Sequence, residues 1–256
     1  MHSLAIAAIT NTGLYRRRNE DSLLVGRDVL ACVSLTEPKT WRIDSYPVIL
    51  AVADGIGGSV AGDIASREVM RCLARPLCPD REETLHNLIQ AAQTHLDHLV
   101  ETRPDLDGLG TTLAGVLALH DRIIIFSCGD SRVYMNLPGN EGIQCMTKDH
   151  SVVQEMIETG RLTEKEARSH PLGHIITSCL SGGRRRSSLD IRMSTHPIQK
   201  GTRLVLCTDG VWDYGGELFL KAALRGDPTS ATQEVLSICY DAGAPDNITL
   251  IIADVE

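Results

Sequence analysis

Acidic clusters recur at five places along this 256-residue chain, each beside glycine or an apolar stretch. They are Asn19-Glu20-Asp21, Asp54-Gly55-Ile56-Gly57-Gly58, Gly129-Asp130-Ser131-Arg132, Asp209-Gly210-Val211-Trp212-Asp213 and Asp246-Asn247. If the fold gathers them, like charges about 4 Å apart repel by roughly 4 kcal/mol per pair even at an effective dielectric of 20. Such a fold needs cations, and oxygen ligands without His or Cys favour magnesium, manganese or calcium over zinc.

Short apolar stretches rich in β-branched residues separate these clusters. They are too short for buried helices and are bounded by Gly, Asp, Asn or Pro, so they predict strands. The predicted strands cover residues 4–9, 48–53, 111–119, 122–127, 131–135, 189–193, 203–207 and 248–253. The pair 111–119 and 122–127, separated only by His120-Asp121, predicts an antiparallel hairpin.

Helical periodicity is clearest over residues 81–101, where leucine, isoleucine and alanine recur every three or four positions. Further helices are predicted over 62–74, 151–159, 217–224 and 229–240. Strands outnumber helices and do not alternate regularly with them. This pattern predicts an α+β fold with antiparallel sheet rather than a doubly wound nucleotide-binding fold.

Length and composition predict one domain over residues 1–256, in a chain of 27.9 kDa. The polar, glycine-containing segment 149–186 is a candidate flap over a site, although a plain surface excursion explains it nearly as well.

A net charge of −8 argues against nucleic-acid binding. The apolar runs are too short to cross a membrane, and the first residues lack the pattern of a secretory leader. The eight scattered cysteines predict reduced core residues of a cytoplasmic protein.

Three of the acidic residues stand at the ends of predicted strands. Asp54 and Asp209 each follow an apolar strand and precede glycine, and Asp246 comes just before the last strand. One such residue is explained well enough as a helix cap. Three of them, far apart in sequence, are better explained as ligands of a shared cation.

The ordered set of motifs resembles that of the metal-dependent type 2C protein phosphatases, the PPM family, and is closest to their compact bacterial members. The resemblance rests on residues 13–21, Asp54-Gly55-Ile56-Gly57-Gly58, Gly110-Thr111-Thr112, Gly129-Asp130-Ser131-Arg132, Thr147-Lys148-Asp149-His150-Ser151, Asp209-Gly210-Val211-Trp212-Asp213 and Asp246-Asn247-Ile248-Thr249. Each motif is weak alone, but together they span the chain in the family's order.

The resemblance implies a central sandwich of two antiparallel sheets, helices on both outer faces and a binuclear Mg²⁺ or Mn²⁺ centre at one end. Asp54 would bridge the two ions. Asp209 and Asp246 would complete the ligands of the first ion, and the Gly55 carbonyl would serve the second.

The remaining acidic residues receive outer roles by the same resemblance. Asp21, with Glu20 beside it, would hold metal-bound waters. Asp130, together with Asp209 or Asp213, matches the positions that bind a looser third metal.

Arg16 corresponds to the arginine that holds the substrate phosphate in the family. Two metals about 3.5–4 Å apart can lower the pKa of a bound water to about 7, and the resulting hydroxide would attack phosphorus in line. Arg16 would neutralise charge on the phosphoryl oxygens. A cysteine nucleophile is disfavoured, because this chemistry requires no phosphoenzyme.

Some residues depart from the family pattern or receive structural interpretations. Ile56 stands where many eukaryotic members have a histidine, so the general acid is left unassigned. His150 is expected to fix a loop, His95 and His98 to lie on the surface, and Trp212 to anchor packing near Asp209.

The sequence therefore predicts a cytoplasmic, monomeric enzyme that removes phosphate from phosphoserine and phosphothreonine in proteins and opposes a protein kinase. It predicts no binding to nucleic acid or membranes. One alternative is a non-catalytic regulatory member of the same fold that binds a partner. The other is a calcium-stabilised binding protein, although no D-x-[DN]-x-[DN]-G loop with a trailing Glu occurs.

Overall fold

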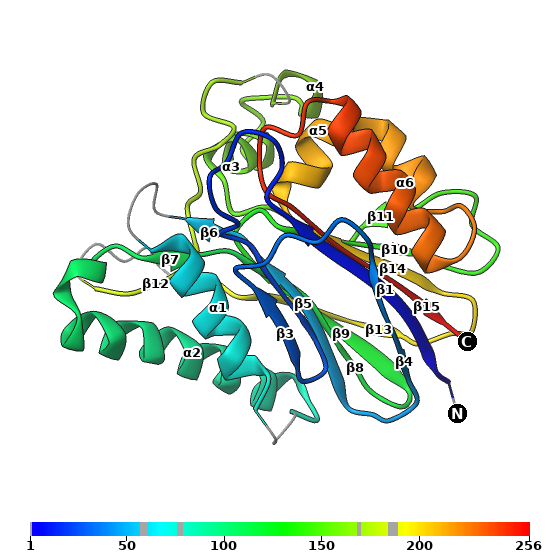
Figure 1. Cartoon of the computed structure of the whole chain (residues 1–256), viewed down its shortest axis with the longest axis horizontal. Helices are drawn as coiled ribbons and strands as arrows, with labels where there is room; N and C mark the ends of the chain where they lie inside the picture. Colours follow the sequence, from blue (N-terminus) through cyan, green and yellow to red (C-terminus); the bar gives the residue numbers. More distant parts are fainter. Residues whose placement is uncertain (1, 57–60, 76–78, 168–169, 184–188) are drawn as a thin grey trace.

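The structure is a computed structural model that describes residues 2–56, 61–75, 79–167, 170–183 and 189–256 (Figure 1). Two antiparallel six-stranded sheets pack face to face, and a pair of helices covers each outer face. This arrangement confirms the predicted α+β sandwich. Gly57 and Gly58 of the second acidic cluster lie outside the described residues, as do parts of the predicted flap.

The first sheet has the strand order β11-β10-β14-β15-β1-β4. Its strands are β1 (Leu4–Asn11), β4 (Lys39–Ile43), β10 (Arg132–Asn136), β11 (Gln144–Cys145), β14 (Arg203–Cys207) and β15 (Ile248–Val255). Helices α5 (Asp209–Ala222) and α6 (Pro228–Asp241) cover its outer face. The chain therefore contributes both its first and its last strands to one sheet.

The second sheet has the strand order β13-β9-β8-β5-β2-β3. Its strands are β2 (Ser22–Val25), β3 (Asp28–Ala31), β5 (Val48–Ala53), β8 (Leu113–Ala118), β9 (Arg122–Cys128) and β13 (Arg192–Pro197). Helices α1 (Gly62–Leu73) and α2 (Glu82–Thr102) cover its outer face. The buried side chains of β5 and β8 alternate between the core under these helices and the core between the sheets, which explains their unbroken apolar sequences.

Shorter elements surround one end of the sandwich. A three-stranded sheet has the order β12-β7-β6, formed by Leu180–Ser181, Gly110–Thr111 and Gly55–Ile56. A 3₁₀ turn covers Pro104–Leu106, and helices α3 (Val152–Glu158) and α4 (Glu164–Ala167) lie in the segment predicted as a flap. The end of that segment is built into the body, because Leu180 is buried and pairs with Thr111.

The sequence located most elements, and its misses have physical causes. The β8–β9 hairpin is confirmed. Helix α5 begins at Asp209 rather than at 217; Gly216 interrupts it with a φ of 54°, so only its second half shows clear helical periodicity. Strand β13 begins at Arg192 rather than at 189 and ends at Pro197, which an edge strand tolerates.

Three early features were missed or misplaced. Strands β2 and β3 were not predicted, and neither was β4, which begins at Lys39. Cys32 and Cys145 are exposed, contrary to the prediction of core cysteines, although Cys72, Cys128, Cys207 and Cys239 are buried. Among the described helices, none combines the length and apolar character that crossing a membrane requires.

Candidate metal centre and active site

Strand register gathers three acidic residues at one end of the first sheet. Arg132 of β10 faces Cys207 of β14, and the same end of β14 lies beside the start of β15. Asp130 precedes β10, Asp209 follows β14 and Asp246 precedes β15. Because antiparallel neighbours run in opposite directions, all three carboxylates lie at the same end.

The second sheet adds two more carboxylates. Ser22 of β2 faces Ala53 of β5, which places Asp21 beside Asp54. Strand β5 also packs against β14 and β15 of the first sheet. The pKa of Asp54 is raised well above its ordinary value, first by burial and then by the negative charges of Asp209 and Asp21. The fold therefore concentrates acidic groups from distant segments, as the sequence predicted.

Asp54 is fixed through its backbone. Its N–H donates to Thr112 Oγ1 at 2.9 Å, and its carbonyl accepts from the N–H of Thr112 at 2.9 Å and from Thr111 Oγ1 at 2.8 Å. Thr112 Oγ1 also lies 2.7 Å from Ser131 Oγ. The Gly110-Thr111-Thr112 motif therefore aligns Asp54 with the neighbouring loop that carries Asp130.

Asp21 is a buried carboxylate with an unused oxygen. Its Oδ2 accepts from Thr208 Oγ1 at 2.8 Å, and its N–H donates to Asn19 Oδ1 at 3.1 Å. Its Oδ1 is buried without a hydrogen-bond partner. Burial raises the pKa of Asp21 to about 7; hydrogen bonds from Thr249 and Thr208 oppose that rise, and Asp209 adds to it. An unpartnered buried oxygen of this kind is costly unless a cation or an ordered water satisfies it.

Asp209 is the first residue of α5 and contacts a second carboxylate. Burial and then Asp246 raise its pKa to about 6, while a side-chain hydrogen bond with Asp54 opposes that rise. Two carboxyl groups can share such a bond only if one of them holds a proton. The next residue must be glycine, because a Cβ on Gly210 would lie 1.9 Å from the Asn247 carbonyl oxygen. This contact holds the start of α5 against the segment that carries Asp246.

Gly55 allows close backbone approach. A Cβ there would lie 2.3 Å from the carbonyl carbon of Gly62 and 2.7 Å from the carbonyl oxygen of Glu20. The N–H of Glu20 donates to Asn247 Oδ1 at 2.8 Å, which ties this loop to the Asp246 segment. The glycine therefore brings the Glu20 backbone, α1 and the end of β5 together.

Arg16 lies at the edge of the cluster. Its Nη2 is 2.7 Å from Oδ2 of Asp246, and its side chain is 51% exposed. The loop that carries it is anchored by Asn247, whose Nδ2 donates to the carbonyls of Thr12 and Arg18. A guanidinium is thus held beside the carboxylates while it remains open to solvent.

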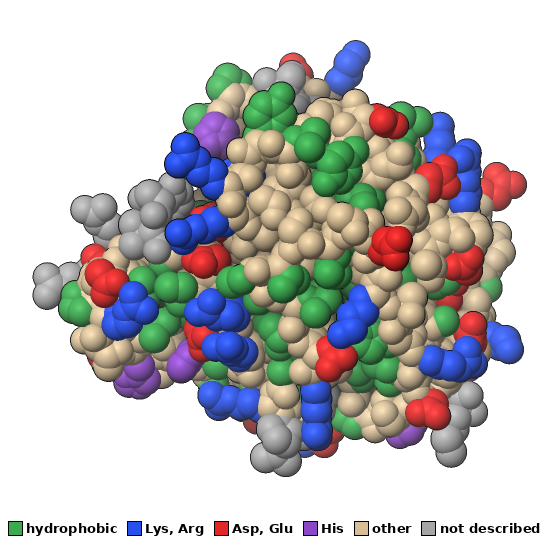
Figure 2. Space-filling model, viewed as in Figure 1, with side chains coloured by type: hydrophobic (Ala, Val, Ile, Leu, Met, Phe, Trp, Pro, Cys, Tyr) green, Lys and Arg blue, Asp and Glu red, His purple; other side chains and the backbone are tan. Residues whose placement is uncertain are grey.

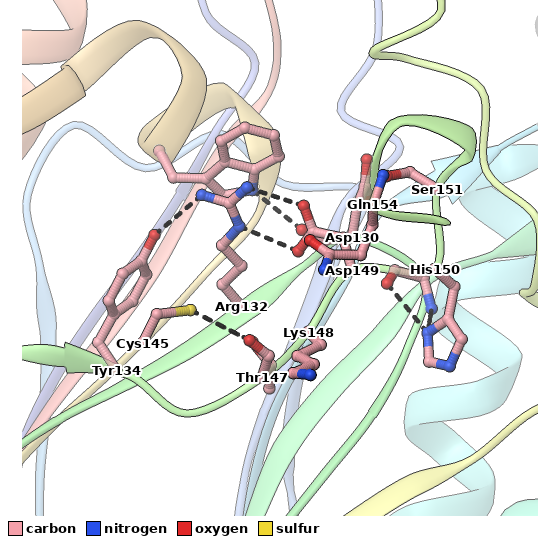
Figure 3. A network of polar contacts seen from close by, with 12 residues as sticks. Asp130, Arg132, Tyr134, Cys145, Thr147, Lys148, Asp149, His150, Ser151 and Gln154 are labelled. Carbon is pink, nitrogen blue, oxygen red and sulfur yellow. Dashed lines mark hydrogen bonds and ion pairs between the residues drawn. The ribbon is translucent and has the colours of Figure 1, made fainter. Parts of the chain in front are cut away.

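Asp130 belongs to a second network, centred on Arg132 (Figure 3). Arg132 forms a two-point ion pair with Asp149, at 3.0 and 2.7 Å, and its guanidinium lies 3.5 Å from the centre of the Trp212 ring. Trp212 Nε1 donates to the Asp130 carbonyl at 3.0 Å. Oδ1 of Asp130 is buried without a hydrogen-bond partner. Asp213 lies exposed one turn into α5.

This network refines the role predicted for Trp212. The side chain packs near Asp209, as expected; it lies in α5 and links Arg132 to the backbone of Asp130. Arg132 and Asp149 were present in the recognised motifs without an assigned role. Only their contact across segments reveals it, because no local spacing predicts a pair separated by 17 positions.

The histidines have structural partners. His150 is buried, and its ring and backbone bond to Gly129 on the loop before Asp130, as predicted for a loop-fixing residue. His95 pairs with Glu68 at 3.3 Å and His98 with Glu101 at 2.9 Å, away from the acidic cluster.

The donor set fits divalent cations. In the described residues, no three His, Cys, Asp or Glu side chains already converge as a complete metal cage. Asp54 and Asp209 instead share a hydrogen bond, and Arg16 holds Asp246 at the edge. Mutual repulsion opposes closer convergence without a cation. The unpartnered oxygens of Asp21 and Asp130 match the oxygen ligands that Mg²⁺ and Mn²⁺ prefer.

Comparison with known proteins decides the family. The family model for protein phosphatase 2C matches residues 34–243. The chain belongs to the protein phosphatase 2C family. Type 2C phosphatases depend on Mg²⁺ or Mn²⁺, so membership of the family confirms the predicted cofactor.

Two bacterial relatives illustrate the relationship. The serine/threonine protein phosphatase PstP of Mycobacterium tuberculosis is 32% identical over 98% of this chain, which spans 45% of that relative's length. The serine/threonine phosphatase stp of Listeria monocytogenes is 30% identical over 82% of this chain and 85% of its own length. The chain therefore spans about half of the first relative and most of the second.

Solved structures agree with the sandwich. The crystal structure of M. tuberculosis PstP/Ppp has a TM-score of 0.83 at 31% identity, covering 99% of both chains. The catalytic domain of PstP, in complex with two manganese ions, has a TM-score of 0.81 at 30% identity, covering 100% of this chain and 99% of the other. The type 2C fold is thus confirmed across the chain.

Proposed function

We propose that this chain is a metal-dependent phosphatase that hydrolyses phosphoserine and phosphothreonine in proteins. The observation that carries the proposal is that strand register places Asp21, Asp54, Asp209 and Asp246 at one end of the sandwich, with Arg16 beside Asp246. Two bound ions supply an activated water nucleophile to phosphoryl chemistry of this kind. The names of the two bacterial relatives support the substrate class.

The proposed ligand roles follow the sequence interpretation. Asp54 follows β5, which packs against β14 and β15 of the first sheet, and it would serve both ions. Asp209 and Asp246 would serve one of them. The Gly55 carbonyl would serve the other. Asp21 is buried beside Asp54 and would not contact an ion directly. Its unpartnered Oδ1 would hold a metal-bound water.

Outer residues complete the proposed site. The Glu20 Oε2 lies beside Gly62, which packs against Gly55, and this carboxylate would also orient water. Asp130 would hold a looser third ion, and Asp213 lies near enough to Asp209 to add to the rise in its pKa. These residues enlarge the negative field around the two main ions.

Arg16 would bind and orient the phosphate. Its guanidinium is half-exposed and already holds a carboxylate, and the same donors fit phosphoryl oxygens in a two-point geometry. Its positive charge would also offset the charge that develops on the phosphoryl group.

We further propose that residues 1–256 form one domain, that 149–186 acts as a flap, and that the protein works as a cytoplasmic monomer against a serine/threonine kinase. The packing of α3 beside the Asp130 loop, through His150 and Gly129, supports a flap near the site. A non-catalytic binding module is the weaker alternative, because the core carboxylates are all present and arranged together.

The test combines metal binding with turnover. Hydrolysis of p-nitrophenyl phosphate and of a phosphothreonine peptide should require Mn²⁺ or Mg²⁺ and should fall at least 1,000-fold, about 4 kcal/mol, in Asp54→Asn. Asp241→Asn removes an exposed carboxylate from the end of α6 and is the matched control. Turnover without metal would refute the mechanism, and Mn²⁺ binding without any turnover would favour the non-catalytic alternative.

A further inference from the structure

Large apolar side chains are exposed at few places in the described residues, and four of them lie in two segments. Leu14 and Tyr15 are 61% and 76% exposed in the loop between β1 and β2, directly before Arg16. Tyr214 and Leu218 are 40% and 63% exposed and lie four residues apart on α5. We call these four side chains the apolar rim.

The other exposed large apolar side chains lie at the same end of the sandwich. Val33 is joined to the loop of the rim, since Asn19 Nδ2 donates to its carbonyl. Leu172 and Ile175 lie in the segment beside α3, where the Val152 N–H donates to the Ile175 carbonyl. Exposed apolar surface is therefore concentrated around the carboxylates.

The rim borders Arg16 and Asp246. The Leu14 N–H donates to the Ala244 carbonyl at 2.8 Å, which holds the loop beside the segment leading to Asp246. On the other side, a Cβ on Gly210 would clash with the carbonyl oxygen of Asn247, so the first turn of α5 packs against the segment that carries Asp246. Tyr214 lies one turn further along the same helix. Figure 1 shows the loop and α5 near each other at this end, and Figure 2 shows apolar side chains gathered over this part of the face.

We propose that the apolar rim binds the residues on either side of the phosphorylated serine or threonine, and that the enzyme favours phosphosites flanked by apolar or aromatic residues. This inference rests on the proposed function. Exposed apolar patches on soluble proteins commonly mark surfaces that bind a partner.

Continuity with the site identifies the occupant as a phosphorylated polypeptide. An extended chain advances about 3.3 Å per residue, so a segment whose phosphate meets Arg16 must lay its neighbouring residues across the surfaces beside Arg16. Those surfaces are Leu14 and Tyr15 on one side and the exposed face of α5 on the other. The tyrosine and leucine side chains at these positions present apolar surface rather than charge to the peptide.

The test compares two phosphothreonine peptides with p-nitrophenyl phosphate. One peptide carries leucine and phenylalanine next to the phosphothreonine, and the other carries serine and glycine at the same positions. The wild-type kcat/KM should be about tenfold higher for the apolar peptide. This is the effect expected when about 50 Å² of apolar side-chain surface becomes buried. Tyr15→Ser combined with Leu218→Ser should reduce this preference to less than threefold, while p-nitrophenyl phosphate, which has no flanking residues, normalises each measurement.

Gln233→Ser is the control, because it changes an exposed, uncharged side chain on α6 away from the rim. Equal kcat/KM values for the two peptides in the wild type would overturn this inference alone. A complete lack of turnover with Mn²⁺ would overturn the proposed function and the inference with it. Sedimentation of wild type and double variant adds a further outcome: a dimer that the substitutions dissociate would show that a second copy covers the rim, which would also overturn the inference.

Discussion

The two ends of the sandwich treat charge in opposite ways. At the end away from the carboxylates, Arg203 is 9% exposed and forms two 2.6 Å bonds with Asp254, and it also donates to the carbonyls of Ala223, Arg225 and Gly226. At the acidic end, Asp21 and Asp130 each keep a buried oxygen without a partner. In the first arrangement, the charges of Arg203 and Asp254 are satisfied within the protein. In the second arrangement, the unpartnered oxygens of Asp21 and Asp130 are available to a ligand. This is the difference between a structural ion pair and a functional site.

The pair at the satisfied end should carry the largest effect on stability. Asp254→Asn leaves Arg203 without its counter-charge, and breaking a buried pair in this way should lower the free energy of unfolding by about 3 kcal/mol. Denaturant unfolding with and without Mn²⁺ measures it, and the loss should be the same in both. The exposed pair of Asp121 and Arg122 is the control, since Asp121→Asn should cost less than about 1 kcal/mol. A loss that Mn²⁺ restores would break the distinction between the two ends.

The acidic end should give the metal-free protein an inverted response to pH. The pKa values of Asp21 and Asp209 are raised to about 7 and about 6, so the folded state holds protons that the unfolded state releases above about pH 4. The stability they provide is full below that pH and is lost as pH rises towards 7, by roughly 2 to 4 kcal/mol. Unfolding at a series of pH values, with EDTA and then with Mn²⁺, checks this. Asp54→Asn should flatten the metal-free profile, and a profile that rises between pH 4 and 7 would contradict the repulsion inferred at this end.

Arg16 should affect substrate binding more than stability. Removing an exposed guanidinium that holds phosphate should raise KM for the phosphopeptide about 10- to 100-fold, equivalent to about 1.4 to 2.8 kcal/mol. Arg16→Ala and Arg16→Lys are compared in steady-state kinetics, with Arg17→Ala as the control on the same exposed loop. The lysine variant should recover part of the binding, because it keeps the charge but loses the two-point geometry. An unchanged KM in Arg16→Ala would reject the role assigned to this residue.

The smallest effect should come from the support beneath Asp130. Trp212→Phe removes the hydrogen bond to the Asp130 carbonyl and weakens the stack on Arg132, which should weaken the loosest Mn²⁺ site about three- to tenfold. Calorimetric titration with Mn²⁺ measures it, and Trp41→Phe on β4 is the control. The two tighter sites should keep their affinity. Equal weakening of all sites would mean that Trp212 supports the whole acidic end rather than Asp130.

Sequence indicated which strand ends carry carboxylates more clearly than it indicated some of the surrounding strands and helices. Asp54 and Asp209 could be recognised because each follows an apolar strand, and β5 and β14 have the predicted bounds. The early edge strands were harder: β3 and β4 are only partly buried, so they lack a strong apolar pattern. The start of α5 was missed because Gly215 and Gly216 interrupt its helical periodicity.

The sequence by itself determined which groups this protein possesses: the separated carboxylates, the glycines that permit close backbone approach, and the arginine before the first acidic cluster. Tertiary structure decided which of them meet. The pairing of β1 with β15 brings the two ends of the chain together, and Asn247 then anchors the Arg16 loop. The contact of Arg132 with Trp212 likewise exists only in the folded chain. The physical reason is that charge and conformational preference are local properties, whereas repulsion, burial and pairing depend on distances that only the complete fold sets.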